Sequence, residues 1–129
     1  MKTADRYRDR DYQHLLPKVL KVMFPAAEDR RAVEEILSAY GKEPYHRERD
    51  RVRLGILKLA WDEPDKLGAY TQLACEDYRD LLCAAEYPYS SRRFDLNDAE
   101  PDKYRELREK ESGEYAAWLE QILSFGNGG

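Results

Sequence analysis

The sequence has few of the residues that build β-sheets and few cysteines. Val, Ile and Thr, whose branched side chains suit a pleated sheet, together number nine in 129 residues. Cys75 and Cys83 are the only cysteines, and eight residues of helix would separate them by about 12 Å, farther than the roughly 7 Å that a disulfide allows. We therefore expect an all-α protein in which both thiols are reduced and fill small spaces in the core.

Long apolar runs are also missing. No segment approaches the roughly 18 to 20 apolar residues that cross a bilayer. Residues 1–11 alternate acidic and basic side chains instead of showing the apolar stretch of a secretory signal. These absences predict a cytoplasmic protein with no membrane role.

The motifs of common enzyme classes are absent too, with neither a GxSxG nucleophile elbow nor a GxxxxGK or GxGxxG phosphate loop. Each histidine follows an acid by three residues, in the pairs Asp11 with His14 and Glu43 with His46. Carboxylate-bridged helical bundles use this spacing for metals. Because both pairs stand at expected helix boundaries, we favour surface histidines and keep a metal-dependent helical-bundle enzyme as a third hypothesis. No catalytic, cofactor-binding or metal-binding residue is assigned.

The sequence has enough apolar and aromatic side chains for one folded domain over residues 1–129. Apolar residues make up 42% of the chain and ten residues are Tyr, which is more core material than a disordered chain carries. Apolar positions recur at helical spacing, which predicts a compact bundle of four to five helices. The expected segments are an N-terminal arm over 1–16, helices over 17–24, 27–40, 44–61 and 63–86, a loop over 87–97, a last helix over 98–125 and a frayed tail over 126–129.

Proline and glycine positions refine these expectations. Pro17 suits the first turn of a helix, because inside one it would remove a backbone hydrogen bond. Only a short turn separates the third and fourth helices, so we expect them to pack as an antiparallel hairpin. Gly55 weakens the third helix, and its expected compensation is the close approach of a neighbouring helix. Gly113 is the point at which the last helix would divide in two.

Two stretches of these central helices resemble known sequences. Residues 52–59 read VRLGILKL and residues 78–88 read YRDLLCAAEYP. They resemble a group of small bacterial proteins of unknown function that carry VRLAILKL-like and YRD...AAEYP-like segments. The resemblance covers residues 51–88 and implies a bacterial origin and a helical fold. It implies no activity and transfers no functional residue.

Charge is divided unevenly along the chain. Residues 1–58 carry a net charge of +4 and residues 59–129 a net charge of −8, so we expect the Arg-rich third helix to pair with acidic helices that follow. The second functional hypothesis is a nucleic-acid-associated regulator, although a sequence pI of about 5.3 makes a nucleic-acid partner unfavourable. Its phosphate contacts would be Arg30, Arg31, Arg47, Arg51, Arg92 and Arg93.

The segment YPYSSRRF, residues 87–94, combines residue types that are enriched at binding interfaces. The alternative is that its aromatic side chains fold back and cover the end of the bundle. Together these observations favour a non-catalytic protein–protein interaction or regulatory module without a cofactor, which binds another protein or itself. The candidate partner-binding residues are Tyr87, Tyr89, Arg92, Arg93 and Phe94.

Overall fold

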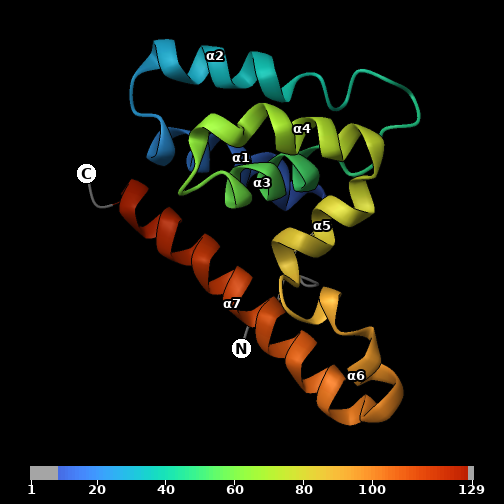
Figure 1. Ribbon diagram of the computed structural model, residues 1–129. Helices are drawn as coiled ribbons and strands as arrows, with labels where there is room; N and C mark the ends of the chain where they lie inside the picture. The colour runs from blue at the N-terminus through green and yellow to red at the C-terminus, as the bar shows by residue number, and fades with distance from the viewer. Residues whose placement is uncertain (1–8, 128–129) are drawn as a thin grey trace.

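The computed structural model describes residues 9–127, which form seven α-helices and two short 3-10 helices, with no strand in this range (Figure 1). In chain order they are α1 (Asp9–Met23), α2 (Ala27–Leu37), α3 (Arg49–Leu59), η2 (Pro64–Lys66), α4 (Leu67–Glu76), α5 (Tyr78–Glu86), η3 (Ser90–Arg92), α6 (Phe94–Ala99) and α7 (Pro101–Asn127). The all-α class is confirmed. The helices of this part of the chain outnumber the four to five expected.

Helix α3 lies at the centre of the core. Its neighbours α1, α4 and α5 pack against it, α2 packs on α4, and α7 runs along α1 and α5 (Figure 1). Apolar side chains cover most of the circumference of α3, as its broad apolar pattern predicts for a central helix. The fully buried ones are Val52, Leu54, Ile56 and Leu57.

The expected N-terminal arm is wrong for residues 9–16, which form the first half of α1, with Pro17 inside the helix. Residues 1–8 lie outside the described range. A proline inside a helix costs about 3 kcal/mol, whereas burial of one large apolar side chain contributes roughly 1.5–3 kcal/mol. The burial of three such side chains ahead of the proline therefore outweighs its cost. They are Tyr12, Leu15 and Leu16.

The helix expected over 63–86 is divided in two at Asp77. This residue has extended backbone angles, φ −156° and ψ 91°, and its side chain accepts a hydrogen bond from the Asp80 amide at 3.2 Å. Asp77 thus caps the N-terminus of α5, a role that suits an aspartate. Because of this break, α3 packs against two separate helices, α4 and α5, and the partner of the expected hairpin is not one continuous helix.

Gly55 permits a close approach between α3 and α5, as expected. A Cβ atom placed on it would lie 3.1 Å from Leu81 Cδ1 and 3.3 Å from Ala85 Cβ. Glycine at this position therefore allows α5 to pack closely against the central helix.

Helix α3 begins at Arg49, later than expected, because polar contacts hold residues 41–48 in a non-helical loop. Gly41 has a positive φ of 111°, and its amide donates to His46 Nδ1 at 2.7 Å. The Tyr40 hydroxyl donates to the Arg47 carbonyl at 2.6 Å and accepts from the Arg47 amide at 3.1 Å. These contacts satisfy backbone groups that a helix would otherwise use.

The C-terminal third also differs from expectation. Residues 94–97, expected in the loop, belong to α6, which ends at Ala99, and the last helix begins at Pro101 instead of residue 98. Helix α7 then continues through Gly113 without a break. One glycine costs a helix only about 1 kcal/mol, and α7 offsets this by burying residues on both sides of it. Residues 126–127 belong to α7 and not to a frayed tail, whereas 128–129 lie outside the described range.

Candidate functional site

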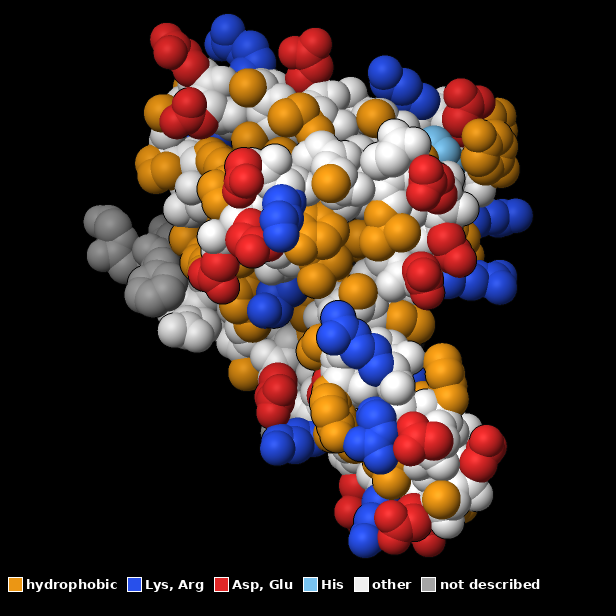
Figure 2. Space-filling model, in the orientation of Figure 1, with side chains coloured by type: hydrophobic (Ala, Val, Ile, Leu, Met, Phe, Trp, Pro, Cys, Tyr) orange, Lys and Arg blue, Asp and Glu red, His pale blue; other side chains and the backbone are white. Residues whose placement is uncertain are grey.

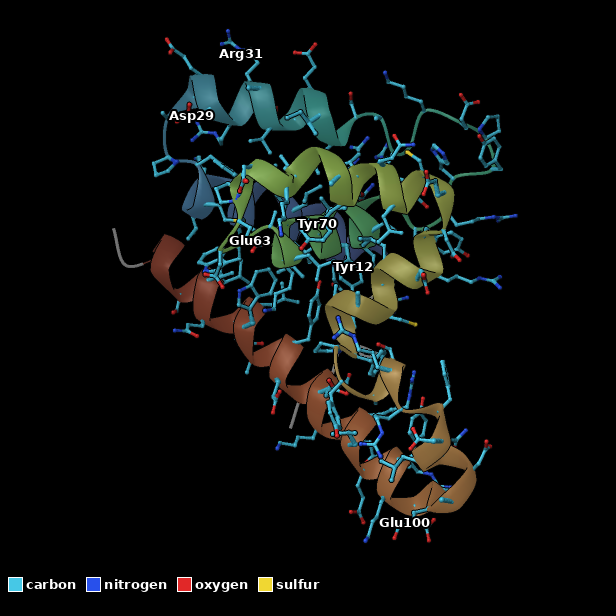
Figure 3. The ribbon with its side chains drawn as sticks, viewed as in Figure 1. Tyr12, Asp29, Arg31, Glu63, Tyr70 and Glu100 are labelled. Carbon is cyan, nitrogen blue, oxygen red and sulfur yellow. The ribbon has the colours of Figure 1, made fainter. Side chains whose placement is uncertain are left out.

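The most prominent surface feature is an arm formed by residues 89–110, which comprise η3, α6 and the first part of α7. Figure 1 shows this arm extending away from the body formed by α1 to α5. Helix α6 packs mainly against α7. Glu100, between the two helices, lies at the far end of the arm (Figure 3). The arm therefore presents a large surface for its size.

A buried carboxylate fixes the start of the arm. Glu111 on α7 is 5% exposed, and its two oxygens accept hydrogen bonds from the backbone amides of Tyr89 at 2.7 Å and Ser90 at 2.8 Å. These amides open a short 3-10 helix, where backbone donors lack partners within the helix. Glu111 thus fastens η3 to α7.

The candidate residues of the segment 87–94 divide into a buried and an exposed part. Tyr87 is only 9% exposed, and the Arg108 guanidinium lies 4.0 Å from its ring centroid. In contrast, Tyr89 is 53% and Phe94 66% exposed. The alternative in which the aromatic side chains fold back is confirmed for Tyr87 and wrong for Tyr89 and Phe94.

The two arginines of this segment have different surroundings. Arg93 donates to the Tyr89 hydroxyl at 2.6 Å and to the Asp95 carboxylate at 3.0 Å. The hydrogen bond between Arg93 and Asp95 raises the pKa of Arg93 and lowers that of Asp95. The exposed Arg92 guanidinium forms no ion pair with any described residue. All the candidate residues except Tyr87 therefore lie at the surface of the arm or at its base. Arg93 links the Tyr89 side chain to Asp95 at the start of α6.

The charges of the arm are balanced. Residues 89–110 contain six basic and six acidic residues, and Figure 2 shows the two signs interspersed on the visible face of the arm. This pattern differs from the one-signed surface that a polyanion requires.

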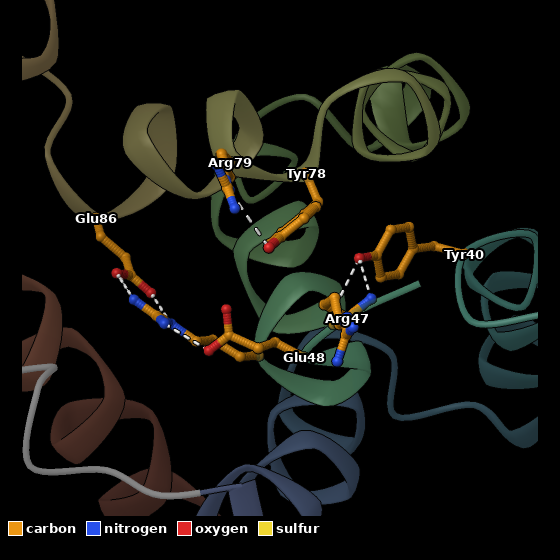
Figure 4. A network of polar contacts seen from close by, with 7 residues as sticks. Tyr40, Arg47, Glu48, Tyr78, Arg79 and Glu86 are labelled. Carbon is orange, nitrogen blue, oxygen red and sulfur yellow. Dashed lines mark hydrogen bonds and ion pairs between the residues drawn. The ribbon is translucent and has the colours of Figure 1, made fainter. Parts of the chain in front are cut away.

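A buried ion pair links the two oppositely charged halves of the sequence (Figure 4). Arg51 on α3 donates from Nε to Glu86 Oε2 at 2.8 Å and from Nη2 to Glu86 Oε1 at 2.5 Å, and its Nη1 also donates to Glu48 at 2.8 Å. The hydrogen bonds to Glu86 are the main cause that raises the pKa of Arg51. The expected pairing of the third helix with a later acidic helix is confirmed for Arg51.

The other arginines of the nucleic-acid hypothesis do not gather on one surface. Arg30 donates to the backbone carbonyls of Phe24 at 2.9 Å and Pro25 at 2.6 Å. Arg31 points outward from α2, on the side of the body opposite the arm (Figure 3). The six arginines thus occupy α2, the 41–48 loop, the core and the arm, and several already bind groups of the protein.

His46 and the two cysteines have structural surroundings, whereas His14 is exposed on α1. His46 Nδ1 accepts from the Gly41 amide, and its ring stacks on Tyr40 with centroids 4.5 Å apart. Within the described range, no three His, Cys, Asp or Glu side chains come together as a metal site. Cys75 and Cys83 are free thiols, and burial raises the pKa of Cys83.

Comparisons with known proteins give no family assignment. No family model, curated protein or solved structure matches the chain. None of the helices between residues 9 and 127 is both long and apolar enough to span a bilayer. The geometry of the chain itself therefore carries the functional argument.

Sequence patterns predict no role for the two buried acids, Glu86 and Glu111. The position of Glu86 does indicate a buried partner, because it stands four residues after Leu82 on the apolar stripe of its helix. An unpaired acid would be costly there. No such mark distinguishes Glu111, since charged residues stand near it at positions 109, 110 and 114. Its role depends on a chain turn that brings η3 back to α7.

Proposed function

We propose that the protein is a cytoplasmic, non-catalytic interaction or regulatory module that binds another protein through the arm. The observation that carries this proposal is the exposure of two aromatic side chains, Phe94 at 66% and Tyr89 at 53%, on one short segment of the arm. Aromatic side chains and arginine are enriched in interface cores and dominate binding hot spots. Here both types occur together within six residues.

The chemistry of the surface indicates what the partner presents. Phe94 requires an apolar pocket, and the unpaired guanidinium of Arg92 favours an acidic group beside that pocket. The balanced charge of the arm suits a protein surface better than a polyanion. Because Arg93 already links Tyr89 to Asp95, the Tyr89 side chain is ordered before binding, which reduces the entropic cost of association.

Site-specific photocrosslinking in a bacterial host tests the proposal. A benzophenone amino acid replaces Phe94 in one variant and Tyr45 in a matched control. Tyr45 is 69% exposed and lies in the 41–48 loop, outside the arm. We expect discrete protein adducts from position 94, none from position 45, and weaker adducts when Arg92→Glu is added.

The identity of the captured species also separates the two forms of the proposal. An adduct of twice the chain mass, with a dimer in light scattering that Phe94→Ala abolishes, makes the partner a second copy of this chain. An adduct of different mass makes it another protein. Equal labelling from positions 94 and 45 contradicts the proposal.

A further inference from the structure

An apolar hollow lies on the body, where the end of α1 meets the turn between α3 and η2. It has a volume of about 310 Å³, and its lining residues are Val22, Met23, Phe24, Trp61 and Pro64. Trp61 is 38% exposed, so part of this lining is open to solvent. A cavity of roughly 150 Å³ holds a benzene molecule. The hollow therefore has room for one aromatic side chain of a partner.

Contacts with the rest of the body hold both sides of the hollow in place. The Trp61 ring meets that of Trp118 on α7 edge to face, with centroids 5.9 Å apart and planes at 88°. On the other side, Arg30 donates to the Phe24 and Pro25 carbonyls and holds the chain just after α1. Because the lining is ordered before binding, the entropic cost of docking a partner there is reduced.

The hollow and the arm lie well apart in one molecule. Figure 3 places Glu63, which stands between the lining residues Trp61 and Pro64, on the body and Glu100 at the far end of the arm. Phe94 on the arm is 66% exposed and lies away from the hollow of its own chain. It is therefore available to the hollow of a second copy.

The unpaired charges next to the two surfaces are complementary. On the turn that lines the hollow, Glu63 and Lys66 pair with each other at 3.1 Å. Asp62 and Asp65 on the same turn are exposed and form no ion pair with any described residue. On the arm, the exposed Arg92 is equally unpaired within the described range. One guanidinium and two carboxylates can thus meet when the arm enters the hollow.

We propose that the partner of the arm is a second copy of this chain, with Phe94 of one copy in the hollow of the next. This inference rests on the proposed function of the arm, to which it adds the partner and its docking site. The two surfaces differ, so the contact is heterologous, and a dimer still presents one free arm and one free hollow. Association therefore continues past the dimer, to a ring or an open chain of copies.

The contact is small, because it consists of one inserted aromatic side chain and a few exposed charges. Small interfaces of this kind belong to transient complexes. We therefore expect a dissociation constant of about 0.1–1 mM for each contact.

Sedimentation velocity and light scattering of the purified full chain test the proposal, at concentrations from about 10 μM to about 1 mM that bracket this constant. We expect the average mass to rise without a plateau at twice the chain mass. Phe94→Ala, and Met23→Lys, which puts a charge into the hollow, should each raise the dissociation constant about tenfold or more. Tyr45→Ala is the matched control, because it removes an aromatic side chain that is 69% exposed and outside both surfaces. A mass that stays at one chain, or a plateau at two, overturns the proposal.

Mixing two variants distinguishes a heterologous contact from a symmetric one. The Phe94→Ala protein keeps its hollow and the Met23→Lys protein keeps its arm, so an equimolar mixture should form dimers with one copy of each and nothing larger. If the mixture behaves as its separate components do, the proposal is overturned.

Met23 is partly buried against the core, and a second pair of variants keeps the test decisive if Met23→Lys prevents folding. The double variant Asp62→Lys with Asp65→Lys changes only exposed positions. It should weaken association about two- to fivefold, the effect of exposed ion pairs. A mixture with the Arg92→Glu protein should reverse this weakening, and failure to do so overturns the proposal.

A benzophenone amino acid at position 94 of the purified chain locates the contact. We expect crosslinked peptides that contain residues 22–24 or 61–64 of a second copy, and crosslinks confined to other parts of a second copy overturn the hollow as the docking site. The bacterial host separates this inference from the proposed function. An adduct of different mass, with no dimer adduct, overturns the inference and leaves the proposed function in place, whereas the absence of any adduct overturns both.

Discussion

The ion pair between Arg51 and Glu86 gives a prediction in which the two partners behave differently. Glu86 is 1% exposed and Arg51 24%, so Arg51→Met leaves a buried carboxylate without its cation. Loss of one partner from a buried pair costs about 3–5 kcal/mol. Glu86→Leu is milder, about 1.5–3 kcal/mol, because Arg51 keeps its hydrogen bond to Glu48 and some contact with water.

The double variant Arg51→Met with Glu86→Leu removes both charges and replaces them with apolar side chains. Such replacements are often neutral or stabilising, so we expect a stability within about 1 kcal/mol of the wild type, above that of either single variant. Urea unfolding followed by tryptophan fluorescence measures all four proteins. With an m-value of about 2 kcal/mol/M, Arg51→Met should lower the midpoint by about 1.5–2.5 M.

Two results would refute this reasoning. If Glu86→Leu costs as much as Arg51→Met, the burial of the carboxylate does not control the energetics. If the losses of the single variants add in the double variant, the two side chains are not coupled. Either result would make the contact between α3 and the end of α5 a matter of packing alone.

Two further predictions concern packing and the arm. Gly55→Ala should destabilise the fold by about 1–2 kcal/mol in thermal unfolding, because its Cβ would press on Ala85 Cβ; Gly68→Ala, which meets open space, should stabilise α4 by up to about 1 kcal/mol. Equal effects would contradict the close approach at Gly55. Glu111→Gln replaces one acceptor of the buried carboxylate with an amide nitrogen, so hydrogen exchange of the Tyr89 and Ser90 amides should accelerate while α3 amides stay protected.

The fold class could be predicted from the sequence because it depends on composition and periodicity. The shortage of branched residues and the helical spacing of apolar positions each pointed to helices, and Gly55 marked a close approach correctly. Helix ends were less predictable. Pro17 has a local preference for the first turn of a helix, but the burial of Tyr12 and its neighbours overrides it. Such tertiary packing is not visible in a local pattern.

The break at Asp77 shows another limit. The apolar stripe runs through residues 67–85 without interruption, so periodicity alone predicts one helix. Asp77, followed three residues later by Asp80, matches the pattern of a helix start. Acids are also common on the solvated face of such helices, so this pattern does not by itself predict a break. For the candidate site, residue types identify the segment 87–94. The contact on the buried Tyr87 ring and the anchoring of the Tyr89 and Ser90 amides come instead from Arg108 and Glu111, which lie far along the chain.

The position of the arm is set by polar contacts more than by an apolar core. Glu86 ends α5, where the helix dipole disfavours a carboxylate, and Arg51 offsets this by holding Glu86 against α3. The end of α5, from which the chain leaves for the arm, is therefore held in place. Glu111 then holds the start of η3 through the amides of Tyr89 and Ser90. Two buried acids thus fix the backbone on either side of Tyr87, Glu86 directly before it and Glu111 through the amides of Tyr89 and Ser90 after it. Because such hydrogen bonds can be lost locally at less cost than a core, the arm should change orientation before the body unfolds.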